Sequence, residues 1–286
     1  MQFQRIMVAV VVALALGAAA PAATAALLID EPFAVGSGAG LYTDGGNLHP
    51  QTAHGDGLTG TWSESSVGFD DWDTISGGLT HPSVATTDGM VKMTRTESGG
   101  HPKYNYADTE YSSGNDQVYW VAFLMQFSNH NAQRIEVDFG ANPLGIGIDG
   151  SGHPGIGSGG NLTTDGSTTL AVDTTYLFVA KVDGTGNTSG GDSEDQYLWI
   201  DPDPTTEPLV GSANAHRDSG DRFGLTNTYP RDVGLLANAE QDQTRYWDEI
   251  QVATSFEDLN LIPEPATLAL LGLGGAVMLG RRRRRA

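Results

Sequence analysis

The chain has 286 residues, no cysteine and a formal net charge of −20. Such an excess of carboxylates repels phosphate backbones, so the composition argues against nucleic acid as a partner and favours cations. Because disulfides are excluded, an exported form of this chain has to rely on its core, with bound metal ions as a further means of stabilisation.

The first 25 residues read as a secretory signal peptide. Arg5 precedes the apolar run Ile6–Ala18, and Ala23-Thr24-Ala25 supplies small residues for cleavage. The apolar run is too short to cross a membrane as an uncleaved anchor. We therefore expect export, with a mature chain that begins near Ala26.

Residues 26–260 are expected to form one all-β domain, an antiparallel β-sandwich. Short apolar runs alternate with polar, glycine-rich loops, which is typical of strands joined by turns. Val118–Phe127 is apolar on both faces, which predicts a central strand. Further strands are predicted at Arg134–Phe139, Leu144–Ile148, Thr175–Val182, Tyr197–Asp201, Val233–Leu236 and Arg245–Ala253. Residues 36–60 and 150–172 are predicted to be loops or loosely held edge strands.

Several short blocks of the body belong to one recognisable pattern. They are Glu31-Pro32-Phe33, Gly57-Leu58-Thr59-Gly60-Thr61-Trp62, Tyr119-Trp120-Val121-Ala122-Phe123, Tyr197-Leu198-Trp199-Ile200-Asp201-Pro202, Trp247-Asp248-Glu249-Ile250 and Thr254-Ser255-Phe256. Together they resemble the laminin-G-like, concanavalin A-like jelly rolls. The resemblance implies two packed antiparallel sheets, but members of this family differ in role, so it implies no single function.

Glu136-Val137-Asp138-Phe139 is the sharpest catalytic candidate. It resembles the start of the Glu-x-Asp-x-x-Glu strand of laminarinase-type glycoside hydrolases, in which the first glutamate is the nucleophile and the last is the acid/base. A second carboxylate on the same face of this strand would have to stand at Gly140 or Ala141. We therefore expect no catalytic residues, and Glu249 on the last strand is the nearest alternative donor.

The acidic loop Asp183–Asp195 is the candidate calcium site, with carboxylates at Asp183, Asp192, Glu194 and Asp195. Calcium prefers six to eight oxygen ligands on a flexible loop. The spacing does not fit an EF-hand, and acidic, glycine-rich loops are also ordinary turn sequences. A solvated hairpin loop is therefore the alternative interpretation. The seven histidines form no zinc motif.

Aromatic residues in loops could either stack on sugar rings or fill the ends of the sandwich. These residues are Tyr42, Trp62, Trp72, Tyr104, Tyr106, Tyr111 and Tyr229. A lectin-like module that binds extracellular polysaccharide is accordingly one functional hypothesis.

The end of the chain, residues 261–286, has three parts in order. Pro263, Glu264 and Pro265 come first, the uncharged Ala266–Gly280 follows, and the last part is the cluster Arg281, Arg282, Arg283, Arg284 and Arg285. As a helix, the uncharged part would be ~22 Å long at ~1.5 Å per residue. It would cross the ~30 Å hydrocarbon core only marginally. Arginines can extend to the headgroups and stay cytoplasmic.

This order of parts resembles the PEP-CTERM sorting signal of Gram-negative bacteria. The resemblance implies that an exosortase, a membrane transpeptidase, recognises Pro263, Glu264 and Pro265 and removes the tail. We therefore predict a signal peptide (1–25), a jelly-roll domain (26–260) and a sorting signal with a transmembrane helix (261–286). The predicted function is that of an exported, non-catalytic cell-surface or extracellular-matrix protein, with exosortase and, transiently, the membrane as partners. A lectin-like module and a laminarinase-type hydrolase are the alternatives.

Overall fold

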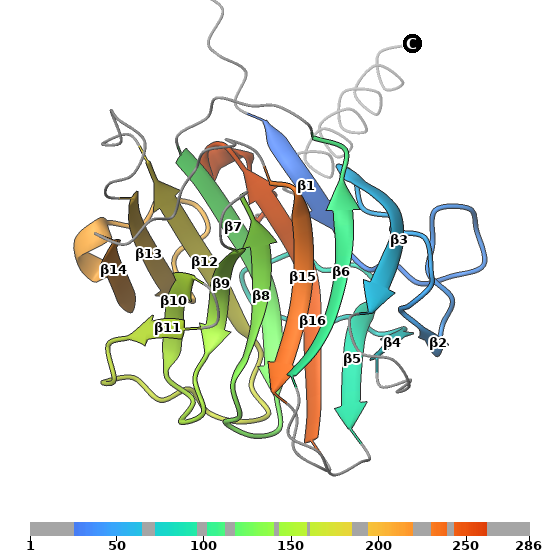
Figure 1. Ribbon diagram of the computed structural model, residues 1–286, viewed down its shortest axis with the longest axis horizontal. Helices are drawn as coiled ribbons and strands as arrows, with labels where there is room; N and C mark the ends of the chain where they lie inside the picture. The colour runs from blue at the N-terminus through green and yellow to red at the C-terminus, as the bar shows by residue number, and fades with distance from the viewer. Residues whose placement is uncertain are drawn as a thin grey trace, which may run out of the picture.

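The computed structural model describes residues 26–64, 72–95, 102–111, 118–139, 143–158, 161–184, 194–219, 230–238 and 243–261. Over these ranges the protein consists of two antiparallel sheets packed face to face (Figure 1). The predicted all-β antiparallel sandwich is therefore confirmed. None of the helices within the described ranges has the length and apolar character needed to span a membrane. The predicted signal peptide and C-terminal helix lie outside these ranges.

The larger sheet has nine strands in the order β14-β13-β12-β7-β16-β5-β4-β2, with β1 paired to β16. Their bounds are β1 Leu27–Glu31, β2 Gly46–Asn47, β4 Trp72–Ile75, β5 Met90–Arg95, β7 Val118–Phe127, β12 Tyr176–Asp183, β13 Glu194–Ile200, β14 Ala215–Ser219 and β16 Gln243–Ala253. The predicted central strand is β7, which lies between β12 and β16.

The smaller sheet has seven strands in the order β11-β10-β9-β8-β15-β6-β3. Their bounds are β3 Leu58–Glu64, β6 Pro102–Thr109, β8 Gln133–Asp138, β9 Pro143–Ile148, β10 Pro154–Ser158, β11 Asn161–Thr164 and β15 Asp232–Asn238. Two short 3-10 helices, η1 Val210–Ser212 and η2 Phe256–Asp258, complete the described elements.

The main core lies between the two sheets, because every second residue of each central strand points inward. Phe123 and Phe178 are cross-strand partners in this layer, and their rings stack with centroids 5.0 Å apart. Both are fully buried, as are Ile135 and Leu235 of the facing sheet. Burial of this layer is the main source of the stability of the sandwich.

A second apolar cluster lies on the outer face of the nine-stranded sheet. Trp120 of β7 and Trp199 of β13 belong to it, and their rings stack with centroids 5.7 Å apart. Both tryptophans are 2% exposed. They are buried because loops and the C-terminal end of the domain cover this face.

The last described residues, which we call the terminal segment (residues 256–261), cover part of this outer face. Phe256 packs edge-on against Trp120, and Leu259 and Leu261 join the same cluster. The start of the domain meets its end nearby, because the Ala26 amide donates a hydrogen bond of 3.0 Å to Thr254 Oγ1. Both ends of the domain are thereby fastened to one part of the nine-stranded sheet.

Candidate functional site

The outer face of the seven-stranded sheet carries a group of carboxylates beside one exposed aromatic ring. Asp232 of β15 is the Cα partner of both Asp138 on β8 and Asp108 on β6. Two residues further along β15, and so on the same face, Gly234 is the Cα partner of both Glu136 and Tyr106. We call these four carboxylates and Tyr106 the acidic face. Their neighbours Ile135, Val137, Val233 and Leu235 point the other way, into the core.

Gly234 leaves the space between Tyr106 and Glu136 without a side chain. A Cβ atom added there would meet no atom closer than 3.6 Å, which is ordinary van der Waals contact. Packing therefore does not require glycine at this position. Tyr106, beside this gap, is 39% accessible.

The charges on this face are only partly compensated. Arg134 Nε donates a hydrogen bond of 2.7 Å to Glu136 Oε1, and both side chains are largely buried. Burial raises the pKa of Asp232 to about 6, and the nearby carboxylates of Asp138 and Asp108 raise it as well. The face thus combines a carboxylate held by an arginine with a carboxyl group that titrates near neutral pH.

The two positions tested on the strand of Glu136, Gly140 and Ala141, carry no carboxylate. Asp232 stands on the adjacent strand, one diagonal step from Glu136. Sequence reasoning named Glu249 as the alternative donor and missed this neighbour. The alternative donor, Glu249, is wrong, because it belongs to β16 in the other sheet.

Glu249 is part of a buried group of carboxyls that fastens loops to the nine-stranded sheet. Asp248 accepts hydrogen bonds from the amides of Leu79 and Glu249, and Glu249 accepts one from the amide of Thr87. Burial raises the pKa of Asp248 to about 9 and that of Glu249 to about 7. Because the oxygens of Asp248 are bonded to backbone amides, we assign this group a structural role.

The candidate calcium loop lies only in part within the described residues. Asp183 and Asp195 are Cα partners at the ends of β12 and β13, with Glu194 next to Asp195, while Asp192 lies outside. Asp183 Oδ2 is 3.5 Å from Lys181 Nζ, and Asp195 Oδ1 is 3.3 Å from His216 Nε2. In the described part of the chain, no three His, Asp or Glu side chains form a group that could hold a metal ion. Calcium binding stays a prediction.

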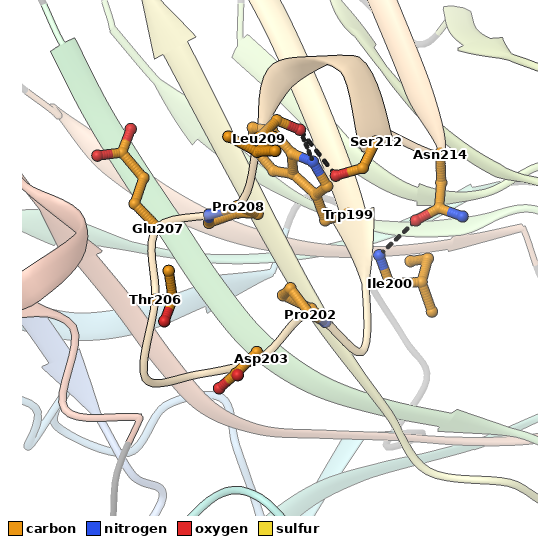
Figure 2. Close-up of a pocket in the computed structure, with 10 residues that line it drawn as sticks. All are labelled: Trp199, Ile200, Pro202, Asp203, Thr206, Glu207, Pro208, Leu209, Ser212 and Asn214. Atoms are coloured by element: carbon orange, nitrogen blue, oxygen red, sulfur yellow. Dashed lines mark hydrogen bonds between the residues drawn. The ribbon is translucent and has the colours of Figure 1, made fainter.

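A cleft of about 380 Å³ lies beside β13, on the nine-stranded sheet. Figure 2 shows Trp199 between Leu209 and Pro202, with its indole Nε1 donating to the Leu209 carbonyl oxygen at 3.1 Å. Ser212 Oγ donates to the same oxygen at 2.8 Å, and this fixes the loop over the indole. The lining is Trp199, Ile200, Pro202, Asp203, Thr206, Glu207, Pro208, Leu209, Ser212 and Asn214. Its apolar wall with carboxylates at the rim is a second candidate surface for a small ring.

Three of the seven loop aromatics proposed to stack on sugars fill the interior. Tyr42, Trp62 and Trp72 are at most 1% exposed, so stacking by these three is wrong. Tyr111 is half-buried and donates a hydrogen bond of 2.5 Å to the Leu28 carbonyl. Among the members of this set whose side chains the structure describes, Tyr106 is the most exposed. Tyr229 lies outside the described residues.

A family model matches the C-terminal tail of this chain. Residues 261–285 match the PEP-CTERM protein-sorting motif. The protein is therefore exported and is anchored or processed at the cell envelope. The matched range includes Pro263, Glu264, Pro265 and the arginine cluster, which lie outside the described residues. A search of curated proteins gives no match.

Solved structures that resemble the body are β-sandwiches. They include an alginate lyase of family PL-14 from Aplysia kurodai, with 11% identity, coverage of 68% of this chain and 88% of that chain, and a TM-score of 0.42. A lectin from Bauhinia forficata in complex with GalNAc has 10% identity, coverage of 67% and 96%, and a TM-score of 0.35. Alginate lyase Aly36B has 13% identity, coverage of 62% of this chain and 85% of that chain, and a TM-score of 0.36. At this level of similarity, the ligands of these proteins carry no argument about this chain.

Proposed function

We propose that the protein is an exported, non-catalytic component of the cell surface or extracellular matrix, sorted by an exosortase. The observation that carries the proposal is the PEP-CTERM motif over residues 261–285. The proposal includes these domain boundaries: a signal peptide at residues 1–25, the mature domain at 26–260 and the sorting signal at 261–286. The fastening of Ala26 to Thr254 supports a mature domain that begins near Ala26.

Mass spectrometry of the envelope and medium fractions tests this proposal. In a host with an exosortase, the mature protein should begin near Ala26 and lack residues 266–286. Glu264→Ala should leave the tail in place, because it removes the central residue of the motif. Finding only wild-type chain that is intact through Arg285 would contradict the proposal.

A second candidate function, polysaccharide binding, is favoured by the exposed ring of Tyr106 beside the carboxylates of the acidic face. Aromatic rings offer an apolar surface to sugar rings, and carboxylates accept hydrogen bonds from sugar hydroxyls. The clustered negative charge repels a polyuronate and attracts an amino sugar. The ligand class that fits is therefore a neutral or amino-sugar polymer.

Binding to a neutral β-glucan, chitosan and alginate separates these classes. We expect binding to the first two polymers and none to alginate. Tyr106→Ala should weaken binding strongly, whereas Leu209→Ala, on the cleft beside β13, should not change it. Alginate as the best ligand would contradict the charge argument. If Leu209→Ala weakens binding and Tyr106→Ala does not, the ligand binds in the cleft beside β13.

A further inference from the structure

The C-terminal end of the domain is packed against the body close to the sorting motif. Leu259 and Leu261 are 5% and 3% exposed, and both belong to the apolar cluster on the outer face of the nine-stranded sheet. Only Ile262 separates Leu261 from Pro263, the first residue of the motif. The residues immediately before the motif are therefore held by the folded domain.

We propose that this packing limits the rate of exosortase processing, so that the terminal segment has to detach from the sheet before the motif is recognised at full rate. The inference rests on the proposed function, in which Pro263, Glu264 and Pro265 are recognised by a membrane transpeptidase. According to this inference, the fold of the substrate itself sets the rate at which the exosortase recognises the motif.

The number of residues between Leu261 and Glu264 limits how far the motif can lie from the domain surface. A fully extended chain spans at most about 3.6 Å per residue, so Glu264 lies within about 11 Å of a packed Leu261. An enzyme embedded in the membrane would then have to bind the motif directly against the domain surface. If the segment detaches back to Thr254, the same reach grows to roughly 35 Å. Detachment therefore gives the enzyme room to bind the peptide on both sides of Glu264.

The terminal segment is suited to detach without unfolding the domain. The hydrogen bonds described for it are local: the Leu259 amide donates to the Phe256 carbonyl at 3.2 Å, and Ser255 Oγ donates to Asp258 Oδ2 at 2.7 Å. It is held to the sheet by apolar contacts of Phe256, Leu259 and Leu261. Chain ends with few fixed hydrogen bonds open at lower free energy than core strands. Strand β16 keeps its pairing when the segment opens.

The test measures the initial rate of tail removal from the full chain in membranes that contain an exosortase. Leu261→Ala weakens the packing, and a flexible Gly-Ser insertion of about six residues after Leu261 bypasses it without changing the packed residues. Each should raise the rate about tenfold, because the rate follows the population of the open form, and a tenfold change corresponds to about 1.4 kcal/mol. Val172→Ala, at an apolar residue that is 40% exposed and belongs to neither core cluster, is the control and should process at the wild-type rate.

The outcomes separate this inference from the proposed function. If wild type is processed and both altered chains are processed at the same rate, the packing is not limiting and the inference fails while the proposed function stands. The inference also fails if the insertion accelerates processing but Leu261→Ala does not. If wild type keeps its tail, and Glu264→Ala behaves no differently, the proposed function itself fails.

Discussion

Removal of one buried oxygen, by Tyr42→Phe, should destabilise the domain strongly. Tyr42 is fully buried, and its hydroxyl donates a hydrogen bond of 2.6 Å to Glu31 Oε2. The hydroxyl oxygen of Tyr42 also accepts a hydrogen bond of 2.9 Å from the indole Nε1 of Trp62. A hydrogen bond to a charged group contributes about 1.5–3 kcal/mol, and a buried donor left without a partner costs about 1–3 kcal/mol. We expect a loss of about 3–5 kcal/mol in the free energy of unfolding.

The pH dependence of this loss provides an internal check. Burial raises the pKa of Glu31 from 4.5 to about 7, and the hydrogen bond from Tyr42 opposes this rise. Because the folded-state pKa is raised, the stability linked to the Glu31 proton is fully present below about pH 4.5 and is lost as the pH rises through 7. Tyr42→Phe removes the bond to the ionised form, so its cost should be larger at pH 9 than at pH 5.

Urea unfolding of the purified mature protein at pH 5 and pH 9 measures both effects. Tyr111→Phe is the matched control, because its hydroxyl makes a single hydrogen bond to the Leu28 carbonyl and is half-buried. That control should lose about 0.5–1.5 kcal/mol. A loss of less than ~1 kcal/mol for Tyr42→Phe, or an equal loss at both pH values, would refute the reasoning.

Three further predictions concern the core, the acidic loop and catalysis. Phe178→Ala should lower the free energy of unfolding by about 3–5 kcal/mol in urea titrations, and a variant as stable as wild type would remove Phe178 from the core. If the loop binds calcium, millimolar calcium should raise the melting temperature of the wild-type protein by linkage. The double substitution Asp192→Asn and Asp195→Asn should abolish this rise. If calcium leaves the wild-type melting temperature unchanged, the loop is a solvated hairpin. The mature protein should release no reducing sugar from β-glucan, and turnover that disappears in Glu136→Gln would establish a hydrolase.

Sequence patterns predicted the central strands well because those strands are apolar enough to be recognised alone. Val118–Phe127 is apolar on both faces, and the structure has β7 with these same bounds. The edge strands offered no such signal. In the edge strand β14, Ala215–Ser219, only Ala215 is a buried apolar residue. The strand β6, which lies between β15 and β3, was not predicted either, and its inward positions include the buried amide of Asn105. Short polar strands form because a neighbouring strand supplies the hydrogen bonds.

The acidic face could be predicted only in part, because it depends on strand register. Ile135, Val137 and Phe139 alternate with polar residues in the sequence, and the structure buries all three in the core, which leaves Glu136 on the opposite face. The neighbour Asp232 comes from a distant part of the chain, and no local pattern fixes which strand pairs with β8. Cross-strand partners of this kind become visible only when the pairing of β15 with both β6 and β8 is known.

The terminal segment and the acidic face lie on opposite outer faces of the sandwich. The terminal segment leaves from the outer face of the nine-stranded sheet, whereas the acidic face is the outer face of the seven-stranded sheet. Leu261 is the last described residue and leads directly into the sorting motif. The acidic face therefore lies on the side of the domain opposite to the point at which the sorting signal begins.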